Sequence, residues 1–357
     1  MSPPVHTASM KRVREPEPSI AAKASPSRRT LRGLDWLNFF LADVQTGVGP
    51  FLAIYLAGYG WNEQRVGLAL TVGGIAGILT QTPAGALVDR WRSKRALITA
   101  GIVALAAGAW LIALVPTFWS VMSAQVLIGG TSSIFGPAIC AVSLGIVGRK
   151  LFDLRQGRNQ AFNSAGNVIA AVSMGLLGYF VSNRSIFFFV SVCALPTILT
   201  LLLIRPDEID YARARGAKEG GEDGEPAGSW GRKPLLLVAF GALPVRAVLY
   251  TLTVNTRALV AIQILDGVAA AIFGVVSVLV IADLTKGTGR FNLTLGAIGT
   301  AVGIGASLSQ VIAGSIVHHF GSNTGFLFLA AVAAAAFGIL FFFMPETRDK
   351  RFPSPTP

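Results

Sequence analysis

The sequence contains few charged residues. Asp, Glu, Lys and Arg make up 13% of the 357 residues, and 52% are hydrophobic. A soluble globular domain has about 25% charged residues, so the composition excludes a chain folded in water. It predicts an all-α polytopic membrane protein in which each span takes about 20 apolar residues.

Cysteine and histidine are also scarce. The only cysteines, Cys140 and Cys193, both lie inside apolar runs, which excludes a disulfide framework. The three histidines have no metal-ligand neighbours, and no Ser-His pair or His/Cys/Asp cluster is present. The glycine-bearing stretch 283–292 lacks the Gly-Lys-Ser/Thr ending of a phosphate loop and is interpreted as a gate loop. We expect no cofactor, no metal and no enzymatic activity.

Basic residues outnumber acidic ones, and the net charge is +12. The basic side chains occupy short gaps between apolar runs instead of one domain face, so nucleic acid is not an expected partner. The expected partners are the lipid bilayer and a small solute, with or without a coupling ion.

Ten apolar runs follow one another at a regular spacing. The expected spans are Leu34–Ala57, Val66–Val88, Ala96–Val115, Phe118–Val147, Ala161–Val181, Ile186–Ile204, Leu235–Val254, Ala258–Ala282, Phe291–Val317 and Gly325–Met344. The organisation predicted from them is a disordered basic tail (1–30), a six-helix bundle (31–204), a flexible Gly- and acid-rich linker (205–233), a four-helix partial bundle (234–345) and a short tail (346–357).

The distribution of Lys and Arg predicts the orientation. With the N-terminus in the cytoplasm, cytoplasmic segments contain 26 of the 30 basic residues and the outer gaps contain three, Arg65, Arg184 and Arg257. This is the positive-inside pattern. We expect an integral protein of the plasma (inner) membrane with both termini cytoplasmic.

An internal repeat relates the two parts of the chain. At a shift of 139 residues Trp91 meets Trp230 and Lys94 meets Lys233, and at a shift of 138 Gln125 meets Gln263. The sequence of spans three to six is therefore repeated in spans seven to ten, as in transporters built from parallel repeats. Residues 31–90, about two spans, have no second copy in the repeat. At the position expected for this copy the chain has only 25 residues of loop (205–229).

The turn after the second span carries a charged motif. Gly85, Leu87, Asp89, Arg90 and Lys94, with Arg95 beside them, match a signature of the form Gly-x-Leu-Ala-Asp-Arg-x-Gly-Arg-Lys. On this motif and the repeat, the chain resembles the major facilitator superfamily over about Leu31 to Glu346. The resemblance implies two six-helix bundles around a path that opens alternately to either side, and it implies that Asp89 belongs to a cytoplasmic latch. The chain departs from the family in lacking the equivalents of helices seven and eight.

Polar residues inside apolar spans are costly in a bilayer and often functional. On a helical wheel Asp35, Asn38 and Gln45 share one arc of the first span, with Asp43 near its edge. Asn163 and Asn167 share a side of the fifth span, and Gln125 stands where the family often has an arginine, so proton antiport through such an arginine is not expected. These residues are path candidates: Asp35, Asn38, Asp43, Gln45, Gln125, Asn163 and Asn167. Helix-to-helix packing is the alternative role for them.

Arg246 and Asp266 are charged residues that also lie inside apolar spans. Both are ten residues from a turn near Thr256, so antiparallel helices place them at the same depth. The sequence predicts a buried ion pair between them, either structural or part of coupling.

Two functions remain open at this point. One is a secondary active transporter of a small solute. The other is an internally shortened relative that no longer transports, because a ten-helix chain leaves one side of the path open unless the linker, a rearrangement or a homo-oligomer closes it.

Overall fold

The computed structural model describes residues 26–46, 49–217, 231–253 and 255–347, and in this part of the chain the protein is helical. The side chains at 43, 45, 46, 49 and 50 lie outside the description. The helices are α1 (Arg28–Thr46), α2 (Gly49–Gly58), α3 (Glu63–Arg90), α4 (Lys94–Leu114), α5 (Phe118–Phe180), α6 (Asn183–Leu203), α7 (Tyr211–Ala214), α8 (Arg232–Leu252), α9 (Thr256–Leu284), α10 (Phe291–Phe320) and α11 (Ser322–Phe343), with a 3₁₀ turn at Pro206–Glu208.

Eight described helices are long and apolar enough to cross a membrane: α3, α4, α5, α6, α8, α9, α10 and α11. Many of their large apolar side chains, such as Leu79, Leu202 and Phe343, are exposed in the isolated chain. An apolar surface of this kind is stable only against lipid. The protein is therefore an integral membrane protein with multiple spans.

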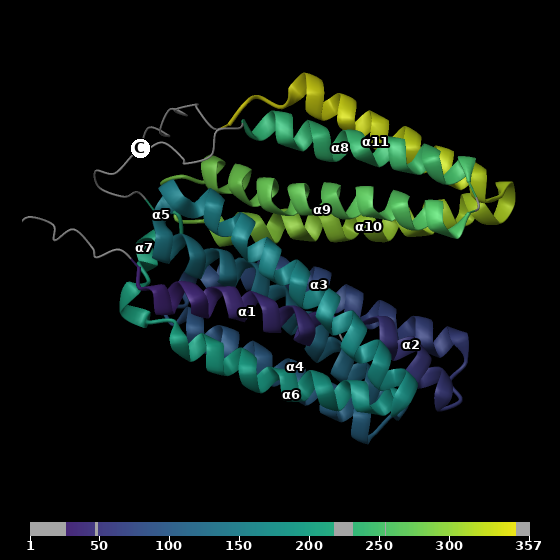
Figure 1. The fold of residues 1–357 in the computed structure, drawn as a ribbon, viewed down its shortest axis with the longest axis horizontal. Helices are drawn as coiled ribbons and strands as arrows, with labels where there is room; N and C mark the ends of the chain where they lie inside the picture. Colours follow the sequence, from purple (N-terminus) through teal and green to yellow (C-terminus); the bar gives the residue numbers. More distant parts are fainter. Residues whose placement is uncertain (1–25, 47–48, 218–230, 254, 348–357) are drawn as a thin grey trace, which may run out of the picture.

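The helices form two groups (Figure 1). In the first, α1 and α4 pack against both α5 and α6, and α3 packs against α5; we call α1–α6 the N-terminal half. In the second, α8 packs against α9 and α11, and α10 packs against α11; we call α8–α11 the C-terminal half. The halves meet where α3 contacts α10 and α5 contacts α9.

Helix α5 is 63 residues long and covers two of the expected spans, Phe118–Val147 and Ala161–Val181. It bends at Gly148, whose φ of 66° and ψ of 177° are not helical. A positive φ costs glycine little and other residues much, so one glycine turns the chain. The expected loop at 148–160 is therefore wrong: the helix resumes at once after Gly148, and its Arg155, Gln156 and Asn159 are buried inside the bundle.

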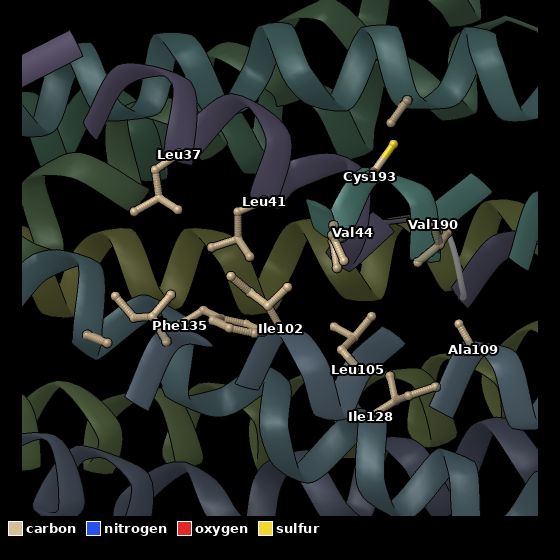
Figure 2. Packing of buried hydrophobic residues seen from close by; sticks show 14 of the residues in the cluster. Leu37, Leu41, Val44, Ile102, Leu105, Ala109, Ile128, Phe135, Val190 and Cys193 are labelled. Carbon is tan, nitrogen blue, oxygen red and sulfur yellow. The ribbon is translucent and has the colours of Figure 1, made fainter. Parts of the chain in front are cut away.

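The N-terminal half has a continuous apolar core. Figure 2 shows Leu37 and Leu41 of α1, Ile102 and Leu105 of α4, and Phe135 of α5 converging in it. The helices also come close through small residues: a Cβ on Gly129 of α5 would overlap the backbone of Gly73 in α3. Close backbone approach at small residues is the usual way in which membrane helices associate.

The linker is more structured at its start than its composition indicated. Residues 206–214 form the 3₁₀ turn and α7, and the side chain of Asp210 caps α7 by accepting hydrogen bonds from the N–H groups of Ala212 (2.9 Å) and Arg213 (3.2 Å). The expected tails at 1–25 and 348–357, and the acidic part of the linker at 218–230, lie outside the described residues.

Candidate functional site: the closed end between the two halves

The sequence motif lies where α3 meets α10. Asp89, in the last turn of α3, accepts hydrogen bonds from the backbone N–H of Leu293 (2.8 Å), the side-chain amide of Asn292 (2.8 Å) and the backbone N–H of Asn292 (3.4 Å). Leu293 and Asn292 are in the first turn of α10, where N–H groups lack helical partners and the helix dipole is positive. A carboxylate of the N-terminal half thus caps a helix of the C-terminal half.

Small residues let α3 and α10 approach this closely. A Cβ added to Gly85 would overlap the backbone carbonyl of Asn292, and one added to Gly296 would overlap the carbonyl of Gln81. One turn beyond Gly296, the hydroxyl of Thr300 is 2.8 Å from that of Thr82. Gly85 of the motif is therefore a packing residue that permits the contact made by Asp89.

The basic residues of the motif have different environments. Lys94 is 1% exposed, and its ammonium donates to the backbone carbonyls of Val88 and, at 2.7 Å, Trp91. A cation beside the carbonyls that end a helix is stabilised by the helix dipole, so Lys94 closes the end of α3. Arg90 is exposed, whereas Arg95 is half-buried. We call the end of the molecule that carries these residues the basic end.

The start of the linker also joins this contact. The side-chain amide of Asn292 donates to the carbonyl of Ala214 at 3.0 Å as well as to Asp89. The N–H of Gly287 donates to Gly216 at 2.8 Å, and the N–H of Asp210 donates to Gly145 of α5 at 3.0 Å. Residues 209–217, which we call the strap, thus contact both halves.

A second polar contact between the halves surrounds Arg232. This side chain, 3% exposed at the start of α8, makes a bidentate contact with Asp153 of α5 at 2.7 and 3.0 Å. Its Nε is 3.2 Å from a carboxylate oxygen of Asp283 in α9. Glu346, after α11, accepts from the backbone N–H groups of Arg232 (2.8 Å) and Lys233 (3.1 Å).

This cluster was not predicted from the sequence, although two of its residues lie in segments that the sequence analysis had singled out. Arg232 belongs to the repeat of the basic motif, and Asp283 belongs to the stretch interpreted as a gate loop. Asp153 lies in a segment that was expected to be a loop, and its partner is 79 positions away along the chain. A pattern in the sequence does not pair residues so far apart.

Between these two polar contacts lies an apolar cluster shared by the halves. The N-terminal half contributes Cys140, Leu144 and Phe152, and the C-terminal half contributes Leu279, Ile281, Ala282 and Phe291. The rings of Phe152 and Phe291 meet edge to face, with centroids 6.2 Å apart. Burial of such side chains excludes water, so the basic end is closed by apolar packing as well as by hydrogen bonds.

Two of the path candidates belong to a buried polar network inside the N-terminal half. Asp35, 2% exposed, binds Arg155 at 2.6 Å and Arg158 at 2.7 Å, both from the second part of α5. Asn38 donates to Asn159 at 3.2 Å, and Asn159 also accepts from Arg155 at 2.7 Å. This network joins α1 to α5 and satisfies a buried carboxylate.

The remaining candidates are spread over other sites. Gln125 is 6% exposed and donates to the carbonyl of Ala69 at 3.1 Å, which joins α5 to α3. Asn167 donates to Asn163 at 3.1 Å, and both are half-buried. Asp43 and Gln45 belong to α1, but their side chains lie outside the described residues.

Arg246 of α8 and Asp266 of α9 form an ion pair. The side chains are 28% and 27% exposed, so the pair is half-buried rather than buried as expected. Its neighbours explain the difference. Gln263, which accepts from Tyr250 and donates to Asp266, is also exposed, so no described helix covers this side of α8 and α9.

No group of three or more His, Cys, Asp or Glu residues with metal-binding geometry occurs in the described part of the chain. Asp89, Asp153 and Asp283 are instead occupied by amides and guanidinium groups. The chemistry available at the basic end is the making and breaking of hydrogen bonds and ion pairs between two halves.

The chain is similar to known membrane transporters. The family model of the Major Facilitator Superfamily matches residues 35–227 and 224–357. Two uncharacterized MFS-type transporters of Mycobacterium tuberculosis, from strains CDC 1551 and H37Rv, are each 38% identical over 394 residues, covering 90% of this chain and 94% of the relative.

Among solved structures, the human organic anion transporter MFSD10 has the same fold. The TM-score is 0.64 at 14% identity, and the match covers 88% of this chain and 99% of that one. The family model and the mycobacterial relatives together span nearly the whole sequence. The chain therefore belongs to the major facilitator superfamily, a family of transporters and not of enzymes.

Proposed function

We propose that this protein is a secondary active transporter that moves a small solute by alternating access, and that the structure represents the conformer closed at the basic end. One observation carries the proposal: Asp89 of one half caps the first turn of α10 in the other half. This contact uses polar groups that water can satisfy equally well after separation, so it can be broken and remade at low cost.

The extent of the contact supports an opening at the opposite end. The residues that join α3 to α10 run from Asp89 and Asn292 to Ile78 and Gly303. Beyond them α10 continues for about as far again, and its Ile304, Leu308 and Val311 are 47%, 57% and 69% exposed. The two halves separate in this direction in Figure 1. With the basic end in the cytoplasm, as the distribution of Lys and Arg favours, this conformer faces outward, and both termini are cytoplasmic.

The path candidates then differ in the conformer in which solute can reach them. Asn163 and Asn167 are half-buried already. Asp35, Asn38 and Gln125 are buried by contacts within the N-terminal half, and they line a path only if these contacts loosen in another conformer. We propose Asp43 and Gln45, on the same helix as Asp35, as the outward part of this lining.

Uptake into vesicles of purified, reconstituted protein tests the transport function. The panel should include organic anions, because the human protein of the same fold transports them. We expect at least one solute to accumulate, and we expect Asp43→Asn to reduce its uptake while the conservative Asp207→Asn, at an exposed residue without a described hydrogen bond, leaves it unchanged. Failure of every solute with correctly folded protein would contradict transport by this chain.

A second function, that of a shortened relative without transport, has a specific observation in its favour. The alignment with the mycobacterial relatives is 394 residues long and this chain has 357, so at least the difference, 37 positions, of each relative has no counterpart here. The repeat places such a gap before Trp230. We propose that the chain has ten spans, six plus four, and lacks one helix pair that walls the path in the family.

Two measurements separate these functions. The genomic DNA around the codons for Gly228, Ser229 and Trp230 would show whether two further spans are encoded there. Cross-linking of the protein in vesicles would show whether a second copy closes the open side. A monomer with an authentic junction and no uptake would support the shortened, inactive relative.

A further inference from the structure

A cavity lies on the outer side of the N-terminal half, away from the contact between the halves. It has a volume of about 290 Å³ and is formed by the beginning of α4, the end of α6 and the start of the strap. Its lining residues are Ser93, Arg95, Ala96, Thr99, Leu201, Leu202, Pro206 and Tyr211. In Figure 1, α4 and α6 form the edge of the molecule farthest from α8 and α11.

The cavity contains a cation without a partner. Arg95 makes no hydrogen bond or ion pair with any described residue, and its Nε is fully buried and unsatisfied. A buried guanidinium N–H without an acceptor is costly, and such groups in native proteins usually face a water or an ion. Because the guanidinium fork matches phosphate and carboxylate geometry, an oxyanion is a suitable partner for this side chain.

The other walls indicate which class of oxyanion fits the cavity. Leu201 and Leu202 give the cavity an apolar side, and Leu202 is 58% exposed. Trp91, two residues before the cavity begins, is 52% exposed, and Tyr211 lines the cavity. Tryptophan and tyrosine gather at the headgroup level of a membrane, so the cavity lies at the boundary between headgroups and acyl chains.

We propose that this cavity binds the phosphate of an anionic phospholipid. Arg95 pairs with the phosphate, the hydroxyls of Thr99 and Tyr211 are available to donate to it, and an acyl chain lies along Leu202. The volume suits a headgroup rather than a whole lipid, because pockets for drug-sized ligands begin at about 300 Å³. The site is separate from the proposed solute path.

Native mass spectrometry of the full-length protein, offered phosphatidylglycerol and phosphatidylcholine, tests the proposal. We expect selective retention of phosphatidylglycerol, lowered at least about fivefold by Arg95→Gln, the factor that corresponds to about 1 kcal/mol for one basic side chain near an anionic headgroup. The matched control is Arg92→Gln, because Arg92 is exposed and does not line the cavity. Equal loss in both variants, or no loss in either, would overturn the site.

Two further measurements identify the source of the anion and test the cavity without changing its charge. Excess inorganic phosphate should not displace the lipid; complete displacement would mean that the cavity takes free phosphate, which overturns the lipid assignment. Ala96→Trp fills the cavity from an exposed position without touching the charge. It should lower lipid retention as Arg95→Gln does, and unchanged retention would contradict the proposal.

Discussion

At the scale of single residues, Asp89 and Asn292 show how much one contact depends on geometry. Each oxygen of Asp89 accepts from the first turn of α10, and Asn292 donates at once to Asp89 and to Ala214 of the strap. The motif predicted a latch role for Asp89, and this role stays a prediction. Asn292 was not identified, because no sequence pattern links residues 203 positions apart.

Substitution Asp89→Asn should weaken the closed conformer. The charge at the helix start is lost and one acceptor oxygen becomes a donor, which faces the N–H of Leu293 or the amide of Asn292 unfavourably. Hydrogen bonds to charged groups contribute about 1.5–3 kcal/mol, so the ratio of closed to open conformers should fall about tenfold or more. Disulfide cross-linking of cysteines placed at the basic ends of α3 and α10 measures this change.

The control for this prediction is Asp207→Asn. Asp207 is exposed, and no described residue bonds to it. An equal change in cross-linking from both variants would mean that the loss of any negative charge weakens the closed conformer. The latch role of Asp89 would then be wrong.

Gly85→Ala should open the same contact by sterics alone. A Cβ at this position overlaps the carbonyl of Asn292, which is backbone and cannot rotate away. We expect lower cross-linking between α3 and α10 with the charges unchanged. Gly74→Ala, on the same helix with nothing within 4 Å of the added Cβ, should behave as the unsubstituted protein.

At the scale of helices, the Arg232 cluster ties α8 to α5 and α9. Arg232→Gln leaves the carboxylates of Asp153 and Asp283, 11% and 20% exposed, without their buried cation. Breaking one partner of a buried ion pair costs about 3–5 kcal/mol. The melting temperature in detergent should fall. Adding Asp153→Asn should recover part of the loss, because one uncompensated charge is then removed.

An exposed basic residue gives the matched control for this experiment. Arg290, just before α10, is exposed and has no described ion pair. Arg290→Gln should change the free energy of unfolding by less than about 0.5 kcal/mol and leave the melting temperature nearly unchanged. If the double variant melts below Arg232→Gln, the two side chains are not coupled as the distances indicate.

The ion pair between α8 and α9 gives a further prediction at this scale. Arg246→Asp and Asp266→Arg should each lower the yield of folded protein, because each places two like charges together in the membrane. The exchanged pair should recover the yield measured by size-exclusion chromatography. No recovery would mean that other neighbours of the two positions dominate.

At the scale of the whole molecule, closure at the basic end comes from Asp89, the apolar cluster and Arg232 acting together. Each part joins the same two halves, so loss of one should bias the conformers without unfolding either half. The N-terminal half has the larger continuous core. Among the described residues, the C-terminal half has few fully buried side chains.

Orientation is also a property of the whole chain. A fluorescent protein fused to the C-terminus should fluoresce in a bacterial host, and a periplasm-dependent phosphatase fused there should be inactive. The same phosphatase inserted after Thr117, or after Asn255, should be active, because basic residues are scarce in these turns. The opposite result would place the basic end outside and reverse the proposed direction of opening.

The sequence by itself determined the membrane class, the positions of most spans and the motif around Asp89, because hydropathy and short motifs depend on neighbouring residues. Only the tertiary structure decided that α5 continues past Gly148, that the strap contacts both halves, and that Asp153 meets Arg232. The reason is physical. These features depend on partners that folding brings together from distant positions, and the free energy of a buried polar group is set by these partners and not by its place along the chain.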